Sequence, residues 1–143
     1  MAKTGKDMAT RVRDRKPSPI QYIETMRQLI IHTDFYMAKL PKALTFTKRV
    51  PISQMLLEAA NCLISANGIK AICKEDWLKR RDLLQNALGA VNALDFHLSI
   101  LIDTQNYFTL LGEFAWEEWG RLISEERRLI LGVLEKDKEK GLG

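Results

Sequence analysis

Hydrophobic residues recur along most of this chain at alternating steps of three and four, the spacing that gathers them on one face of an α-helix. The first helix is predicted to start near Ser18, which can cap it, with Pro19 in its first turn and Gln21 completing a capping box. Pro41 disfavours helical geometry at Leu40 and therefore ends this helix. Its inward positions are Tyr22, Met26, Leu29, Thr33, Tyr36 and Leu40.

The second pattern predicts a helix that starts between Thr47 and Val50, because Pro51 is tolerated only in a first turn. Asn67 and Gly68 are typical of a helix C-terminus and mark its end or a kink. The inward positions of this helix are Ile52, Leu56, Ala59, Leu63 and Ala66.

The third pattern predicts a helix from about Asp76 to Ile102, and the polar residues 103–106 separate it from a fourth helix. Its inward positions are Trp77, Leu84, Ala87, Val91, Leu94, Leu98 and Leu101. Arg80 falls on the same stripe, so we expect the first turn of this helix to leave the core there. The fourth stripe consists of Phe108, Leu111, Ala115, Trp119, Leu122, Glu126, Leu129 and Val133, with Phe114, Trp116, Ile123, Ile130 and Leu134 beside it. It is therefore broader than one packing seam needs.

The connections between these patterns are short, and short connections make successive helices antiparallel neighbours. The sequence therefore predicts an all-α fold, an antiparallel up-down-up-down four-helix bundle with a flexible basic N-terminal leader. We divide the chain into a basic, disordered leader (1–17), the bundle (18–135) and a solvated charged tail (136–143).

Composition agrees with one globular domain, since 46% of the 143 residues are hydrophobic and 28% are charged. No stretch reaches the ~18 uncharged apolar residues that a membrane span requires. Cys62 and Cys73 lack a signal peptide and CxxC spacing, so we interpret them as reduced thiols and predict a cytoplasmic protein. Residues 1–17 carry six basic and two acidic side chains, which accounts for the whole net charge of +4. Such a leader suits either attraction to phosphates or simple solubility.

Candidate catalytic groups are few. His32 and His97 lie on different predicted helices, and neither has the carboxylate and second histidine of a helical metal site. Adjacent glutamates at 117–118 and 125–126 diverge by about 100° around a helix, so neither pair converges on one site. We interpret Glu118 as a surface partner of Arg121, and Glu125 as a surface partner of basic residues in the last turn. The sequence therefore predicts no enzyme, no metal site and no cofactor.

Basic clusters are the remaining signal. The connection between the first two helices carries four cations, with no acid between Asp34 and Glu58. A second cluster follows Trp77, which can stack on a base or belong to the core. In an alternating bundle these clusters lie at opposite ends, and the leader lies near the second. The candidate phosphate-binding residues are Arg11, Arg13, Arg15, Lys16, Lys39, Lys42, Lys48, Arg49, Lys79, Arg80 and Arg81.

One stretch resembles a known family. Leu40-Pro41-Lys42-x3-Phe46-Thr47-x4-Ile52, supported by Trp77-x2-Arg80-Arg81-x2-Leu84, is similar to motifs of a group of four-helix-bundle proteins. That group contains the accessory variability determinants of diversity-generating retroelements and the proteins encoded by 23S rRNA intervening sequences. The resemblance extends from about Tyr22 to Leu134.

The resemblance implies a non-catalytic accessory protein that assembles as a pentamer, associates with a reverse transcriptase and with RNA or DNA, and supports mutagenic cDNA synthesis. It implies that Arg49, Lys79, Arg80 and Arg81 contact nucleic acid or polymerase, and that the broad fourth stripe forms a subunit seam. The residues expected in that seam are Trp116, Trp119, Ile123 and Ile130. The long leader and the neutral body depart from the family pattern. The alternative is a protein–protein interaction bundle of the intervening-sequence type, with no nucleic-acid role.

Overall fold

The computed structural model describes residues 20–104 and 106–140, so the predicted leader and the Ser18 cap lie outside the described residues. Within those ranges the chain forms helices and no strands, which confirms the all-α class. Four of the helices are long and one is short: α2 (Gln21–Met37), α3 (Val50–Asn67), α4 (Lys74–Asp103), α5 (Tyr107–Leu111) and α6 (Glu113–Glu139).

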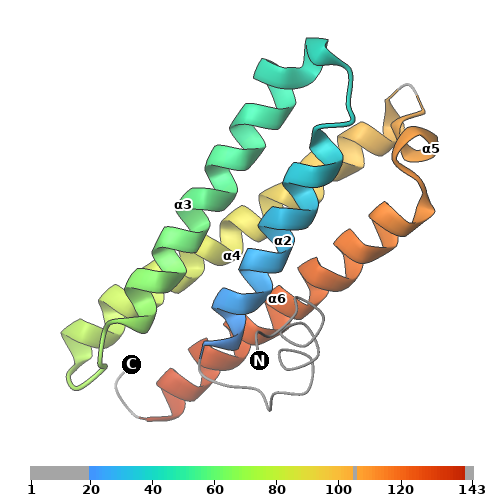
Figure 1. The fold of residues 1–143 in the computed structure, drawn as a ribbon. Coiled ribbons are helices and arrows are strands. Elements are labelled where there is room, and N and C mark those ends of the chain that lie inside the picture. The colour runs from blue at the N-terminus through green and yellow to red at the C-terminus, as the bar shows by residue number, and fades with distance from the viewer. Residues whose placement is uncertain (1–19, 105, 141–143) are drawn as a thin grey trace, which may run out of the picture.

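The four long helices lie alongside one another, and successive ones run in opposite directions (Figure 1). Helix α3 packs on α2 and α4, and α6 packs on α4 and returns to α2. Each long helix therefore has two main neighbours and turns one stripe of side chains toward the centre.

On α2, α3 and α4 the buried stripes match the predicted inward positions closely, whereas Phe108 of the predicted fourth stripe is exposed. All five positions predicted on α3 and all seven on α4 are buried. On α2, Tyr22, Met26, Leu29 and Thr33 are buried, whereas Tyr36 is half-buried. The apolar stripe of each of these helices is the face that its neighbours bury. The helical period of the sequence was therefore enough to predict most of the core.

The connection from α2 to α3 is more structured than its sequence suggested. Helix α2 ends at Met37, and Leu40 is buried beyond it in a turn. A 3₁₀ turn (η1, Lys42–Leu44) and a π-helical turn (η2, Thr45–Arg49) then lead into α3. The start of α3 at Val50, with Pro51 in its first turn, agrees with the prediction.

The predicted fourth helix is interrupted. Asn106 has φ of 63° and Gly112 has φ of 90°, so the short α5 lies between two left-handed residues. Glycine adopts such a conformation without steric cost, which explains why the break falls at Gly112. The Trp116 Nε1 group donates to the Phe108 carbonyl at 3.1 Å, and the two rings stack with centroids 5.9 Å apart. These contacts hold α5 against the start of α6.

The prediction of a solvated tail from residue 136 is wrong at Asp137, although the other described residues of that segment, 136 and 138–140, are exposed. Helix α6 continues to Glu139, and Asp137 is buried on its inner face. The sequence did not predict this burial, because Asp137 stands among alternating charges and its partner, Arg80, is distant in sequence.

A buried hydrogen bond joins the first long helix to the last. Trp119 Nε1 donates to Thr33 Oγ1 at 2.9 Å, and both residues are almost wholly buried. A buried indole N–H without a partner is costly, so Thr33 occupies a core position that its polarity alone would not favour.

We expect Thr33→Val to lower the free energy of unfolding by about 1–3 kcal/mol, because it keeps the shape of the side chain but removes the acceptor. Denaturant unfolding followed by circular dichroism measures this change. Thr33→Ser, which keeps the hydroxyl, is the matched control and should cost less. Equal stability of Thr33→Val and the native chain would show that the bond contributes nothing.

Glu126 is a carboxyl group in the core. It is fully buried, and neither carboxyl oxygen has a hydrogen-bond partner among the described residues. Burial raises the pKa of Glu126 to about 9, so the side chain is neutral at pH 7. Burial also raises the pKa of Tyr22, whose hydroxyl likewise has no partner in the described part of the chain. The sequence placed Glu126 on the inward stripe, and its burial confirms that position.

The raised pKa of Glu126 makes stability depend on pH. Between about 4.5, its ordinary pKa, and about 9, the folded state keeps a proton that the unfolded state releases. The free energy of unfolding contributed by this group should therefore fall as pH rises through that window, by up to about 1.4 kcal/mol per pH unit. Denaturant unfolding between pH 5 and pH 8 should show a flatter profile for Glu126→Gln, whose amide does not titrate. The exposed Glu117→Gln is the control, and parallel profiles for native chain and Glu126→Gln would contradict the assignment.

Candidate nucleic-acid interface

The connection between α2 and α3 gathers four cations in a stretch of the chain that has no acid. We call Lys39, Lys42, Lys48 and Arg49 the connector cluster. Lys48 is half-buried and the other three are exposed. The cluster lies at the end of the molecule where α2 stops and η1 and η2 lead into α3 (Figure 1).

The connector cluster forms no ion pair with any acid in the described residues, since every ion pair there involves other cations. Lys39 instead lies over aromatic rings, with its Nζ 4.5 Å from the centroid of Phe35 and 5.2 Å from that of Tyr36. Such a cation–π contact orients the ammonium group without neutralising it. These four charges are therefore available to an anionic partner.

The cluster at the start of α4 is different, because acids surround it. Lys79 Nζ lies 3.7 Å from Glu75, and a guanidinium nitrogen of Arg81 lies 3.4 Å from Asp82. Arg81 also covers the ring of Trp77 at 5.0 Å. Trp77 is only 7% exposed, so it belongs to the core and is not free to stack on a base.

Arg80 points inward. Its Nε lies 2.6 Å from Oδ2 of Asp137, an ion-pair distance, although the N–H does not point at that oxygen in hydrogen-bond geometry. The guanidinium also donates to the Ile69 carbonyl at 3.1 Å. With 17% of its side chain exposed, Arg80 ties α4 to the end of α6. The prediction that Arg80 contacts phosphate is therefore wrong, whereas the core cluster on α4 begins only after the first turn, at Leu83 and Leu84.

The two predicted basic clusters lie at opposite ends of the molecule, as expected from alternating helix directions (Figure 1). The structure thus does not bring the connector cluster together with residues 79–81. The leader cations Arg11, Arg13, Arg15 and Lys16 lie outside the described residues.

The predicted oligomer seam on the last helix is also wrong. Its four residues are buried inside the single chain, with 9% of Trp116 exposed and less of the other three, Trp119, Ile123 and Ile130. The fourth stripe is broad because it packs on both α2 and α4. Its width therefore reflects two neighbours within one chain.

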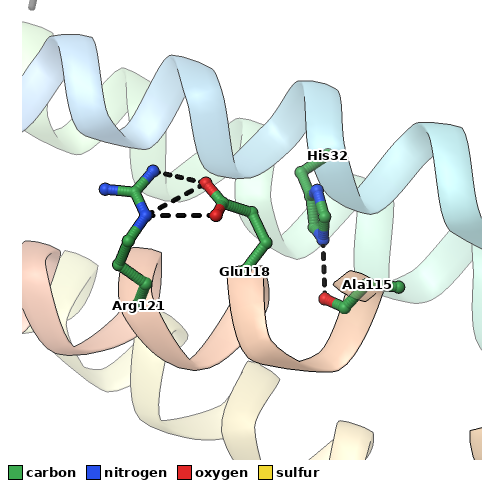
Figure 2. A network of polar contacts seen from close by, with 4 residues as sticks. All are labelled: His32, Ala115, Glu118 and Arg121. Atoms are coloured by element: carbon green, nitrogen blue, oxygen red, sulfur yellow. Dashed lines mark hydrogen bonds and ion pairs between the residues drawn. The ribbon is translucent and has the colours of Figure 1, made fainter. Parts of the chain in front are cut away.

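Figure 2 shows one polar contact that joins α2 to α6 and one ion pair within α6. His32 on α2 donates through Nε2 to the Ala115 carbonyl on α6 at 2.9 Å. Arg121 donates through Nε to both carboxylate oxygens of Glu118 at 3.1 Å. These hydrogen bonds hold the pKa of Glu118 below its ordinary value, so the pair stays ionised at neutral pH. The predicted pairing of Glu118 with Arg121 is confirmed.

Metal-binding groups and membrane-spanning helices are both absent from the described residues. Among residues 20–104 and 106–140, no three His, Cys, Asp or Glu side chains are grouped as a metal ion would require. No helix of the described chain has the length and apolar character needed to cross a membrane. Comparisons with protein-family models, curated proteins and solved structures found no match to this chain.

Phe46 is the residue that sequence reasoning missed. It entered only as part of a family motif, but the structure leaves 83% of it exposed on η2, between the cations of the connector cluster. The available signal was an aromatic residue flanked by Lys42, Lys48 and Arg49 in a stretch without acids.

We expect Asp137→Asn to lower the free energy of unfolding by about 3 kcal/mol, because it leaves the charge of Arg80 largely buried and unpaired. Glu139→Gln, an exposed position near the same helix end, is the control and should change stability by less than about 0.5 kcal/mol. Denaturant unfolding of both variants measures the difference. A reduction for Asp137→Asn no larger than that of the control would show that the pair does not hold α6 to α4.

Proposed function

We propose that this protein is a non-catalytic, cytoplasmic accessory protein of a diversity-generating retroelement. In this proposal an antiparallel up-down-up-down four-helix bundle binds nucleic acid and a reverse transcriptase and supports mutagenic cDNA synthesis. The observation that carries it is the connector cluster, four cations without an acidic partner in the described residues. The alternating directions of the four long helices support the proposed architecture.

The family resemblance supports the same site. Its most specific motif runs from Leu40 to Ile52, which is the stretch that contains Lys42, Lys48 and Arg49. A patch of cations binds nucleic acid by displacing the counterions condensed on its phosphates, with no need for base-specific contacts. The cluster therefore suits binding to RNA or DNA of unrelated sequence.

Assembly into a pentamer, which the resemblance implies, requires a surface other than the buried stripe of α6. Helix α3 supplies a candidate, because Val50, Leu57 and Ile64 recur every seven residues and are 36%, 51% and 55% exposed. Residues at this spacing lie along one side of a helix and can pack on another helix. A homo-oligomer would bring several connector clusters onto one assembly and so strengthen binding to a polyanion.

The second candidate function is a protein–protein interaction bundle without a nucleic-acid role. The exposed apolar stripe on α3 also favours this function, because such a stripe can bind a different protein. The two functions differ in what they require of the cations, which are essential for the first and dispensable for the second.

We expect the combined change of Lys39, Lys42, Lys48 and Arg49 to Gln to weaken binding of structured RNA at least tenfold at physiological salt. The slope of log affinity against log salt should also shrink by about 3, because each phosphate that a cation neutralises contributes roughly 0.7 to 0.9 to that slope. Fluorescence anisotropy between 50 and 200 mM salt measures both quantities.

The matched control replaces four exposed lysines at the other end of the fold, Lys70, Lys74, Lys136 and Lys138, with Gln and alters net charge equally. It should leave most of the affinity and slope intact. Equal weakening by the two variants would assign binding to net charge alone. Absence of RNA binding by the native chain would favour the protein–protein function.

A further inference from the structure

Phe46 is more exposed than any other large apolar side chain in the described residues, at 83%. A phenyl ring in water gains nothing for folding, so the fold does not account for its presence there. Its neighbours along the chain explain why it stays outside: Leu44 packs partly against the core and Lys48 is half-buried. The inward positions of this connection are therefore already occupied.

The backbone beneath Phe46 is ordered by hydrogen bonds. The Leu44 N–H donates to the Pro41 carbonyl at 2.9 Å and closes η1. The Val50 N–H donates to the Thr45 carbonyl and closes η2, which continues directly into α3. The ring is thus presented on a hydrogen-bonded turn that is continuous with a long helix, a support that lowers the conformational cost of binding.

The charges around Phe46 indicate the chemistry of its partner. Lys42, Lys48 and Arg49 lie within four residues of it, and none has an acidic partner in the described chain. A protein that buried the ring would have to offset three cations with acids of its own. A nucleic acid supplies both an aromatic face and adjacent phosphates, the combination that proteins bind with exposed aromatics inside basic grooves.

We propose that the connector binds an unpaired, single-stranded stretch of nucleic acid, in which one base stacks on Phe46 and flanking phosphates contact Lys42, Lys48 and Arg49. This inference rests on the proposed function and specifies its substrate class. Bases in the interior of a duplex are already stacked on both faces, so away from duplex ends the ring can stack only on a base that is unpaired. Stacking uses a face that every base possesses, so the contact selects strandedness without selecting sequence.

The test compares a fluorescent single-stranded 12-mer with a duplex of the same length, using the full chain and its variants. We expect Phe46→Ala to bind the single strand about tenfold more weakly and the duplex unchanged, whereas Phe46→Trp should retain the preference. Phe96→Ala is the matched control, because Phe96 is 65% exposed on α4 and lies outside the connector. Circular dichroism and light scattering of each variant verify folding and oligomeric state.

The salt dependence of affinity distinguishes the contribution of the Phe46 ring from that of the cations. The ratio of native to Phe46→Ala affinity should stay constant as salt rises, because stacking displaces no counterions, whereas the effect of the charge variants should shrink. A native chain that binds the duplex as tightly as the single strand, or a Phe46→Ala variant that keeps the preference, overturns this inference and leaves the proposed function standing. A native chain that binds neither probe overturns both. Altered oligomeric state of Phe46→Ala with unchanged affinity would place the ring in a subunit contact and overturn the inference.

Discussion

The contact between the first and last long helices is the one on which the rest of the arrangement depends. Trp119 lies at its centre, bonded to Thr33 and packed edge-on against His32 at 5.0 Å and beside Tyr36 at 5.8 Å. Helices α2, α3 and α4 pack on their neighbours in the chain, whereas α6 packs both on α4 and on the distant α2. Aromatic packing and hydrogen bonds at this junction therefore cover the remaining apolar stripe of each partner.

The distribution of charge follows from this closed arrangement. At the start of α4, acids lie close enough in sequence or in space to pair with Lys79, Arg80 and Arg81. At the opposite end, the sequence offers no acid between Asp34 and Glu58, and packing brings none into ion-pair contact from the described part of the other helices. The connector cluster therefore leaves one end of the molecule with cations that an anionic partner can contact.

Helical period was enough to predict the helices and most of the core, since burial of one stripe per helix is a local property of the sequence. The features that were missed depend on contacts between distant residues or on backbone conformation. In the sequence, Arg80 and Asp137 each stand among other polar residues. Only the packing of α4 on α6 brings the two side chains together inside the fold. From the sequence, Gly112 could equally lie inside a continuous helix, and only its φ of 90° shows that the helix is interrupted there. The connector cations were predictable, whereas the exposure of Phe46 required the turn that presents it.

The bond between Thr33 and Trp119 joins residues 86 positions apart, so it also sets an order of events during synthesis. Helices α2, α3 and α4 leave the ribosome before α6 exists, and the inner face of α2 then has only part of its cover. Long-range contacts of this kind form late, because the chain between them must first be made and its loop entropy overcome. Until the last quarter of the chain is translated, the side of α2 that carries His32, Thr33 and Tyr36 lacks its cover from α6.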